Sequence, residues 1–144
     1  MKKGRIVFPE CAGTPEYKKV LEEILASGKC PFCPENFNYH EKPILEEKDN
    51  WFITESTWPY ENAANHFLII GKEHKESLDE LTAKDLKTIY HLANKIADKK
   101  NLKGGGLALR FGDGNITGAS VAHLHFHLIF PQPGKIAWFP IGPK

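Results

Sequence analysis

The sequence predicts an α+β domain in which a mainly antiparallel sheet carries two helices. Residues 15–27 and 83–100 place apolar side chains at helical spacing, as expected for helices packed on a core. Strand-like runs outnumber these helices, and their short connections favour antiparallel pairing. With 144 residues, of which 41% are hydrophobic and 26% are charged, the chain suits a single domain over residues 1–144.

Composition and charge argue against several functional classes. The net charge of +1 provides no broad basic surface, so we expect no long nucleic acid as a partner. There is no long apolar run and no apolar leader after Met1, which predicts neither a membrane span nor a signal peptide. The cysteines Cys11, Cys30 and Cys33 are odd in number with one close pair, which favours a cytoplasmic protein with a metal or redox site.

The N-terminal part is expected to start without regular structure and then to form one helix. Residues 1–13 show no helical or strand period. Thr14 is a capping residue, Pro15 suits the first helical position, and Gly28 suits the end of the helix. One apolar stripe lies between them and consists of Tyr17, Val20, Leu21, Ile24 and Leu25.

The middle of the chain predicts three strands. Residues 43–47 and 51–54 are expected to form a hairpin joined by residues 48–50. A polar connection then leads to residues 66–70, an apolar run typical of a buried strand, which ends at Gly71.

Ser77 and Thr82 each stand three residues before a carboxylate, the pattern of a capping box, and the second begins the main helix. The expected inner face of this helix is Leu86, Ile89, Ala93, Ile96 and Ala97. Residues 107–111 are expected to form a strand, followed by a polar loop at residues 112–120. The short proline-rich tail beyond residue 131 is expected to pack across the surface or against a partner subunit.

Residues 123–130 are the most informative segment, because three histidines alternate there with apolar residues. The alternation predicts a strand with its apolar side chains in the core and its histidines on the other, open face. The histidines are His123, His125 and His127, with about 6.5–7 Å between neighbours at a rise of roughly 3.3 Å per residue. The expected core residues are Leu124, Phe126 and Leu128. A tag-like histidine run is disfavoured because the cluster lies inside a strand pattern.

Cys30 and Cys33 have three possible interpretations: a redox dithiol, two thiols without a function, or half of a Cys2His2 zinc site. The redox interpretation is weakened because a helix precedes the pair, whereas redox motifs open a helix. The zinc interpretation is favoured, and spacing does not choose its histidines among His40, His66, His74, His91, His123, His125 and His127. We expect His40 and His91 to be solvated.

Several motifs together resemble the histidine-triad (HIT) family of nucleotide-binding proteins. Residues 123–129 match its pattern of three spaced histidines, and residues 66–74 resemble its upstream strand, with Gly71 in place of a proline. Residues 118–121 are similar to its Gly-x-Ser-Val run. Residues 58–62 resemble the dinucleoside-tetraphosphate phosphorylase-like branch of the family.

The resemblance covers about residues 30–131 and implies a HIT-like antiparallel five-stranded sheet, usually within a homodimer. It also implies chemistry at the α-phosphate of a nucleotide, with His125 as the nucleophile that forms a nucleotidyl-histidine intermediate. His127 would contact phosphate oxygens, and Ser120 would donate a hydrogen bond to the phosphate or the leaving group. The implied substrate is a dinucleoside polyphosphate or a nucleoside phosphoramidate, and the acceptor is water or inorganic phosphate.

Zinc-bearing members of the family imply a structural zinc ion, whose ligands here would be Cys30, Cys33, His74 and His123. Substrate-binding residues are expected at His66, Arg110 and Gly118, the last through the loop amides that follow it. Arg110 would supply a contact that many members take from an asparagine, because Gly112 stands at that position. A base pocket of Trp51, Ile53 and Tyr60 is a further expectation.

Two other functional classes stay open at this point. One is a nucleotide-binding module that acts through protein partners without catalysis, although the presence of Ser120, His125 and His127 favours an enzyme. The other is a thiol oxidoreductase that uses Cys30 and Cys33.

Overall fold

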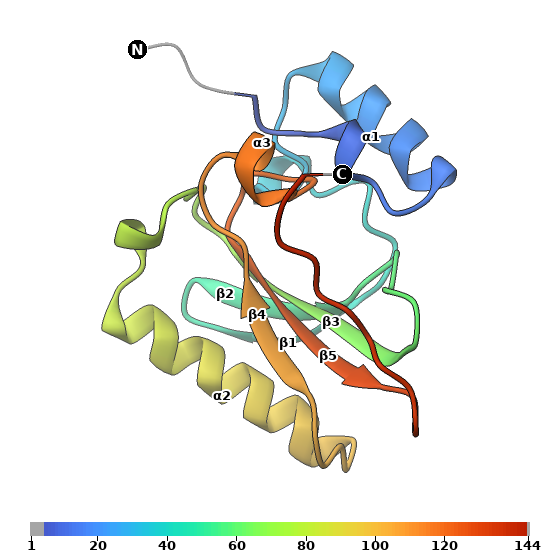
Figure 1. Cartoon of the computed structure of the whole chain (residues 1–144). Coiled ribbons are helices and arrows are strands. Elements are labelled where there is room, and N and C mark those ends of the chain that lie inside the picture. Colours follow the sequence, from blue (N-terminus) through green and yellow to red (C-terminus); the bar gives the residue numbers. More distant parts are fainter. Residues whose placement is uncertain (1–4, 144) are drawn as a thin grey trace.

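The structure is a computed structural model that describes residues 5–143, so residues 1–4 of the expected irregular start lie outside the described residues. Five strands form one antiparallel sheet in the order β1-β2-β3-β5-β4 (Figure 1). The strands are β1 (Ile44–Lys48), β2 (Trp51–Glu55), β3 (Ala63–Gly71), β4 (Gly106–Leu109) and β5 (His125–Pro131). The helices are α1 (Pro15–Ser27), α2 (Ala83–Lys99) and α3 (Gly114–Thr117), with single 3-10 turns η1 (Pro9–Cys11), η2 (Pro34–Asn36) and η3 (Leu78–Glu80). The predicted α+β class with a five-stranded antiparallel sheet is confirmed.

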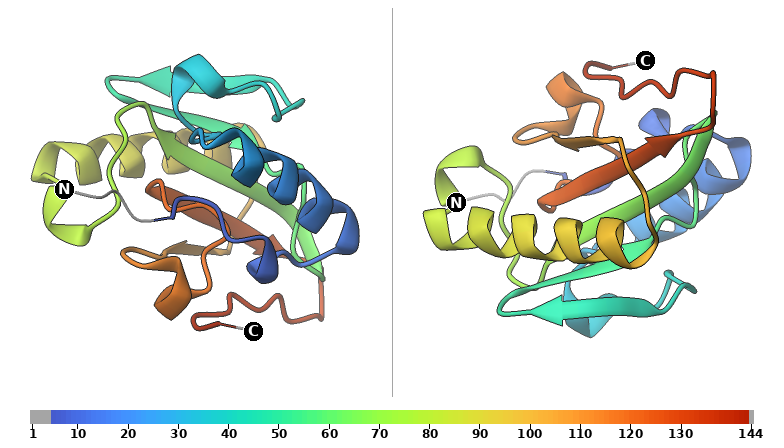
Figure 2. Two further views of the ribbon diagram at one scale, coloured as in Figure 1. Left: turned by 90° about the horizontal axis from the view of Figure 1, so that it is seen from above. Right: turned by 90° about the horizontal axis from the view of Figure 1, so that it is seen from below.

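The two long helices lie on opposite faces of the sheet, with α1 on one side and α2 on the other (Figure 2). On the α2 side, alternate residues of the strands form the main core, as period-2 alternation requires. Its fully or nearly buried members are Trp51, Ile53, Phe67, Ile69, Ile89, Leu92, Ile96, Leu124, Phe126, Leu128 and Phe130. The predicted core residues of the histidine segment are therefore all found on this side.

Helix α2 begins where the capping box predicts. The Thr82 side chain accepts a hydrogen bond from the Asp85 backbone N–H, and the Asp85 carboxylate accepts one from the Thr82 N–H. The predicted inner face is wrong at one position, because Leu86 is 53% exposed whereas Leu92 is buried. Both residues fit a helical period, and the rotation that packing imposes on the helix selects Leu92.

The other face is covered by the N-terminal segment. Helix α1 is capped at Thr14 and ends at Gly28, whose φ of 72° is the left-handed conformation that glycine accepts readily. The sequence predicted no regular structure in residues 5–13, and this prediction is wrong. Val7 pairs with Val121, and η1 follows. Val7 and Val121 form a small core with Leu21 and Ile24 of α1. No sequence period marks this contact because it joins distant parts of the chain.

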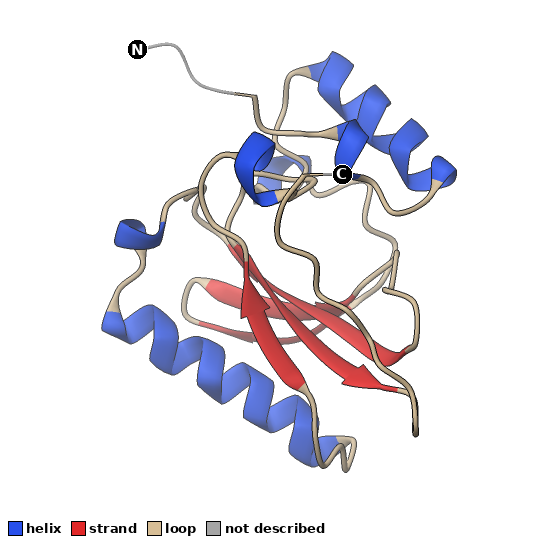
Figure 3. Cartoon of the chain, viewed as in Figure 1, coloured by secondary structure: helices blue, strands red, loops and turns tan. Residues whose placement is uncertain are grey.

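The C-terminal segment after β5 has no regular structure and runs back past β4 towards α3 (Figure 3). The Gly142 backbone N–H donates to the Thr117 carbonyl oxygen, and the Asn62 side chain donates to the Ile136 carbonyl oxygen. The tail therefore packs across the protein's own surface, one of its two expected positions. Among residues 5–143, no helix combines the length and the apolar character needed to cross a membrane.

Candidate functional site

Strand β5 directs its histidines to the face of the sheet that α1 covers. His125 and His127 are 7% and 6% exposed, so the face expected to be open is covered. The Phe32 ring packs on His125, and the Tyr60 and Phe139 rings pack on His127. His123 is also buried but lies just before β5. A cavity on this side is lined by both strand histidines, by Ser120 and by Tyr17 of α1. The site is therefore a covered pocket with His125 and His127 along one wall.

The ring of His125 is held in one tautomer by the backbone. Its Nδ1 lies 2.7 Å from the carbonyl oxygen of His123, which accepts hydrogen bonds only, so Nδ1 carries the proton. Burial lowers the pKa of His125 to about 4, which keeps the ring neutral at neutral pH. A neutral ring with its proton on Nδ1 leaves a lone pair on Nε2, the electronic state that a nucleophilic imidazole needs.

His66 of β3 and His127 of β5 form a second histidine pair. Burial lowers the pKa of His66 to about 4 and holds the pKa of His127 well below its ordinary value, so both rings are neutral. The Tyr60 backbone N–H donates to His66 Nδ1 at 3.1 Å, which leaves the His66 proton on Nε2. That Nε2–H donates to His127 Nδ1 at 2.8 Å, and His127 in turn carries its proton on Nε2.

Arg110 lies next to His127, at the end of the hydrogen-bonded series that runs from the Tyr60 N–H through His66 to His127. Its Nη1 lies 3.4 Å from His127 Nε2, and its Nη2 donates to the Tyr60 hydroxyl at 2.8 Å. The guanidinium stacks over the Phe139 ring, 4.0 Å from its centroid, and its Nε donates to the Pro140 carbonyl oxygen. With the His127 proton on Nε2, this 3.4 Å contact sets two donors against each other, and an anionic oxygen that accepts from both would relieve the conflict.

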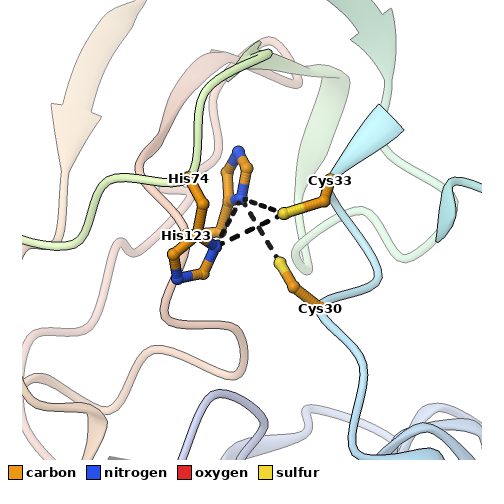
Figure 4. Close-up of side chains that lie close together, drawn as sticks. All are labelled: Cys30, Cys33, His74 and His123. Atoms are coloured by element: carbon orange, nitrogen blue, oxygen red, sulfur yellow. Dashed lines mark hydrogen bonds between the residues drawn. The ribbon is translucent and has the colours of Figure 1, made fainter. Parts of the chain in front are cut away.

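Cys30, Cys33, His74 and His123 form a compact group of metal-ligating side chains (Figure 4). Their four donor atoms all lie within 4.8 Å of one another. His74 Nδ1 and His123 Nδ1 are 3.2 Å apart, Cys30 Sγ lies 3.3 Å from His123 Nδ1, and Cys33 Sγ lies 3.5 Å from His74 Nδ1. A tetrahedral zinc ion with bonds of about 2.0 Å to nitrogen and 2.3 Å to sulfur requires ligand separations of roughly 3.3–3.8 Å. The three separations lie close to this range, so the donor set and its spacing suit zinc.

The outer nitrogen of each histidine in this group has its own acceptor. His123 Nε2 donates to the Gly71 carbonyl oxygen at 2.5 Å, and His74 Nε2 donates to a carboxylate oxygen of Glu76 at 2.7 Å. Such bonds leave Nδ1 without a proton and turned towards the other donor atoms of the group, the arrangement found in most zinc sites with histidine ligands. Sequence reasoning missed Glu76, although a carboxylate two residues after a proposed ligand was a usable signal.

Of the other expected site residues, Tyr60 lines the cavity, whereas Gly118, Trp51 and Ile53 do not. Gly118 lies against the tail, its amide donates to the Gly114 carbonyl oxygen, and an added Cβ would collide with the Gly142 carbonyl oxygen. The expected base pocket is wrong for Trp51 and Ile53, which belong to the core on the α2 side. Tyr60, by contrast, lines the pocket.

The two histidines expected to be solvated differ. His91 is exposed, as expected. His40 is not simply solvated, because its Nε2 hydrogen-bonds to Thr54 Oγ1 at 2.7 Å and its ring stacks on Phe37. His40 lines the cavity together with Tyr17, a residue that helical spacing had assigned only to the apolar stripe.

Comparisons with known proteins agree with this geometry. Residues 29–136 match the protein family described as "Scavenger mRNA decapping enzyme C-term binding". A comparison with curated protein sequences gives no significant match.

Solved structures of histidine-triad proteins share the fold. A HIT family hydrolase from Clostridium thermocellum is 28% identical, covers 77% of this chain and 97% of its own length, and has a TM-score of 0.62. A histidine triad protein from Clostridium difficile is 25% identical, with coverages of 76% and 95% and a TM-score of 0.57. A zinc-bound histidine triad family protein from Mycobacterium smegmatis is 20% identical, with coverages of 82% and 86% and a TM-score of 0.59, a likeness of fold.

The family match covers most of the chain and includes both the upstream strand β3 and the histidine strand β5. The sheet, the triad and the Cys/His group are the features that the resemblance had implied. This protein therefore belongs to the histidine-triad (HIT) family, through the domain family described as "Scavenger mRNA decapping enzyme C-term binding".

Proposed function

We propose that the protein is a nucleotide hydrolase or nucleotidyltransferase that acts at the α-phosphate through a nucleotidyl-histidine intermediate on His125. The observation that carries this proposal is the bond from His125 Nδ1 to the His123 carbonyl oxygen, which leaves the Nε2 lone pair for attack. The HIT family hydrolases among the structural relatives support a hydrolytic activity. The substrate proposed is a dinucleoside polyphosphate or a nucleoside phosphoramidate.

The reaction proceeds in two displacements. His125 Nε2 forms a bond to the α-phosphorus, the bond from phosphorus to the leaving group breaks, and the leaving group takes the bonding electron pair. Water then attacks phosphorus, the phosphorus–nitrogen bond breaks, and His125 recovers its lone pair. An amine leaving group takes a proton from solvent as its bond to phosphorus breaks in the first displacement. The proton lost by the attacking water in the second displacement returns to solvent. Inorganic phosphate in place of water would make the same enzyme a transferase.

The donors around the pocket support binding of the phosphoryl oxygens. His127 Nε2–H and Arg110 Nη1–H converge, and without an acceptor between them they repel each other. A phosphoryl oxygen would accept from both and would thereby stabilise the charge of the transition state. His66 acts through His127, because it fixes the tautomer that presents the N–H to the pocket. Ser120, which lines the same cavity, is the proposed donor to the leaving group.

We propose a structural role for zinc at Cys30, Cys33, His74 and His123. Bound zinc would join the segment between α1 and η2 to the end of β3 and to the start of the histidine segment. Its ligand His123 offers the carbonyl oxygen that orients His125, so the metal would also stabilise the position of the nucleophile. Cysteine thiols persist most readily in a reducing compartment, which supports the proposed cytoplasmic location. The same placement of both thiols against histidine nitrogens argues against a dithiol oxidoreductase.

A homodimer is proposed as the assembly. Leu107 on the edge strand β4 is 48% exposed, and Trp138 and Ile141 of the adjacent tail are 74% and 73% exposed. Exposed apolar side chains of this size on neighbouring segments are typical of an interaction surface. Light scattering after size-exclusion chromatography measures the mass, and a Trp138→Asp variant that shifts from dimer to monomer would support this surface.

The test of the catalytic proposal uses α-labelled diadenosine tetraphosphate and an adenosine phosphoramidate. The wild-type protein should form an acid-labile labelled adduct and turn over at least one of the two. His125→Ala should abolish both signals, whereas His91→Ala, which changes an exposed histidine on α2, should leave them unchanged. Binding of nucleotide without an adduct or turnover would instead support the non-catalytic binding module.

A further inference from the structure

The N-terminal segment lies outside the family match at residues 29–136, yet it contacts Ser120, the residue proposed to donate to the leaving group. The Phe8 backbone N–H donates to the Ser120 carbonyl oxygen at 2.8 Å, and the Ala122 N–H donates to the Ile6 carbonyl oxygen at 2.6 Å. These bonds flank the bridge between Val7 and Val121. The segment thus forms a short antiparallel pairing with the residues that lead into the histidine strand.

Helix α1 adds a contact to the Ser120 side chain. The Tyr17 hydroxyl oxygen lies 2.8 Å from Ser120 Oγ. The Tyr17 ring stacks on Trp58, with centroids 5.3 Å apart and planes inclined by 23°. Leu21 and Ile24, one and two turns further along the helix, are fully or nearly buried and fix α1 over this face of the sheet. Tyr17 is therefore held from both sides, and its hydroxyl is not free to swing away.

The chemistry of the two hydroxyls decides which of them donates. Burial raises the pKa of Tyr17 to about 12, so the phenol is protonated at neutral pH. A phenol is still the more acidic partner and the better donor, whereas the serine oxygen is the better acceptor. The Tyr17 O–H then donates to Ser120 Oγ. The Ser120 O–H remains available to a group bound in the cavity that Ser120 and His125 both line.

We infer that Tyr17 is a positioning residue for the reaction: it orients the Ser120 hydroxyl so that Ser120 donates to the leaving group. This inference rests on the proposed function. Tyr17 does not give up its proton in the reaction; it only fixes the direction of the Ser120 O–H. An element added outside the family domain thereby takes part in recognition of the group that departs from the α-phosphorus.

The test compares Tyr17→Phe, Ser120→Ala and the double variant, with Tyr90→Phe as a matched control because Tyr90 is 67% exposed on α2. Phenylalanine retains the stack on Trp58 and removes only the hydroxyl. We expect kcat for an adenosine phosphoramidate to fall about 2- to 12-fold in Tyr17→Phe, the equivalent of one neutral hydrogen bond, with KM nearly unchanged. In the Ser120→Ala background the same change should have no further effect, because the group that Tyr17 orients is absent.

A second substrate separates positioning from a general loss of structure. The p-nitrophenyl ester of adenosine monophosphate has a leaving group that needs little help from a donor, so Tyr17→Phe should slow its cleavage by less than 2-fold. Equal losses on both substrates, or equal losses with and without Ser120, would overturn the inference while leaving the proposed function intact. A wild-type protein without any labelled adduct would overturn the proposed function and this inference together.

Discussion

The Phe32 ring lies edge-on against the ring of His125, with centroids 4.9 Å apart and planes at 86°. Phe32 stands between the two cysteines of the proposed zinc site, and it makes a similar edge contact to His123. The loop that would bind zinc therefore contacts the proposed nucleophile directly. This arrangement gives the metal site a route to influence the reaction without any contact between metal and substrate.

The contact predicts that Phe32→Leu slows formation of the labelled adduct several-fold while zinc content stays unchanged. Leucine retains most of the apolar volume but loses the ring edge that limits rotation of the His125 ring. Single-turnover kinetics with labelled substrate and metal analysis measure the two quantities. Phe111→Leu is the control, because Phe111 is 47% exposed in the loop after β4. A rate equal to wild type would show that Phe32 only fills space.

Zinc itself gives the next prediction. Cys30→Ser should reduce the zinc content from one ion per chain to nearly none and lower the free energy of unfolding by several kcal/mol. The reason is that binding energies of structural zinc sites are of the order of 10–16 kcal/mol and count towards folding. Metal analysis and urea denaturation test this prediction, with Cys11→Ser as the matched control. A Cys30→Ser protein with its full zinc complement would remove the proposed site.

Some of this site was predictable because the sequence records which face of a strand is buried. The alternation in residues 123–130 separates core from site, since Phe126 and Leu128 enter the core and the histidines take the opposite face. The capping box at Thr82 likewise marks a helix start through local hydrogen bonds. Both the alternation and the capping box depend only on residues close together in the sequence, so both can be recognised from the sequence alone.

Other features depend on contacts between distant segments and leave no such signal. The pairing of residues 6–8 with residues 120–122 has no sequence period, and neither does the covering of the histidine face by α1. The His123 carbonyl that orients His125 is a backbone group, which every residue possesses. Tyr17 fits the apolar stripe of α1 by spacing, and only the fold shows that its hydroxyl reaches Ser120.

Arg110 predicts an effect on substrate affinity. Arg110→Ala should raise KM about 10-fold or more, because a hydrogen bond to a charged group contributes about 1.5–3 kcal/mol. Arg110→Lys should recover only part of this loss, since lysine cannot stack on Phe139 while it donates to Tyr60. Steady-state kinetics at fixed ionic strength measure the effect, and Lys103→Ala, which removes an exposed cation, is the control. An unchanged KM in Arg110→Ala would exclude a phosphate contact at this residue.

The buried His66 predicts how stability depends on pH. Its pKa in the folded protein is lowered from 6.5 to about 4, chiefly because burial disfavours the charged ring. Between these two pH values the unfolded chain binds more protons than the folded one, so the free energy of unfolding decreases as the pH falls from 6.5 towards 4. Above pH 6.5 the contribution of His66 to stability is fully present. His66 alone should lower the free energy of unfolding by roughly 2 kcal/mol between pH 7 and pH 5.

His66→Gln should reduce this slope, because glutamine can accept from the Tyr60 N–H and donate to His127 without titrating. Urea denaturation at several pH values measures the slope, and His91→Gln should match wild type. A His66→Gln slope as steep as that of wild type would show that His66 does not remain neutral in the folded protein.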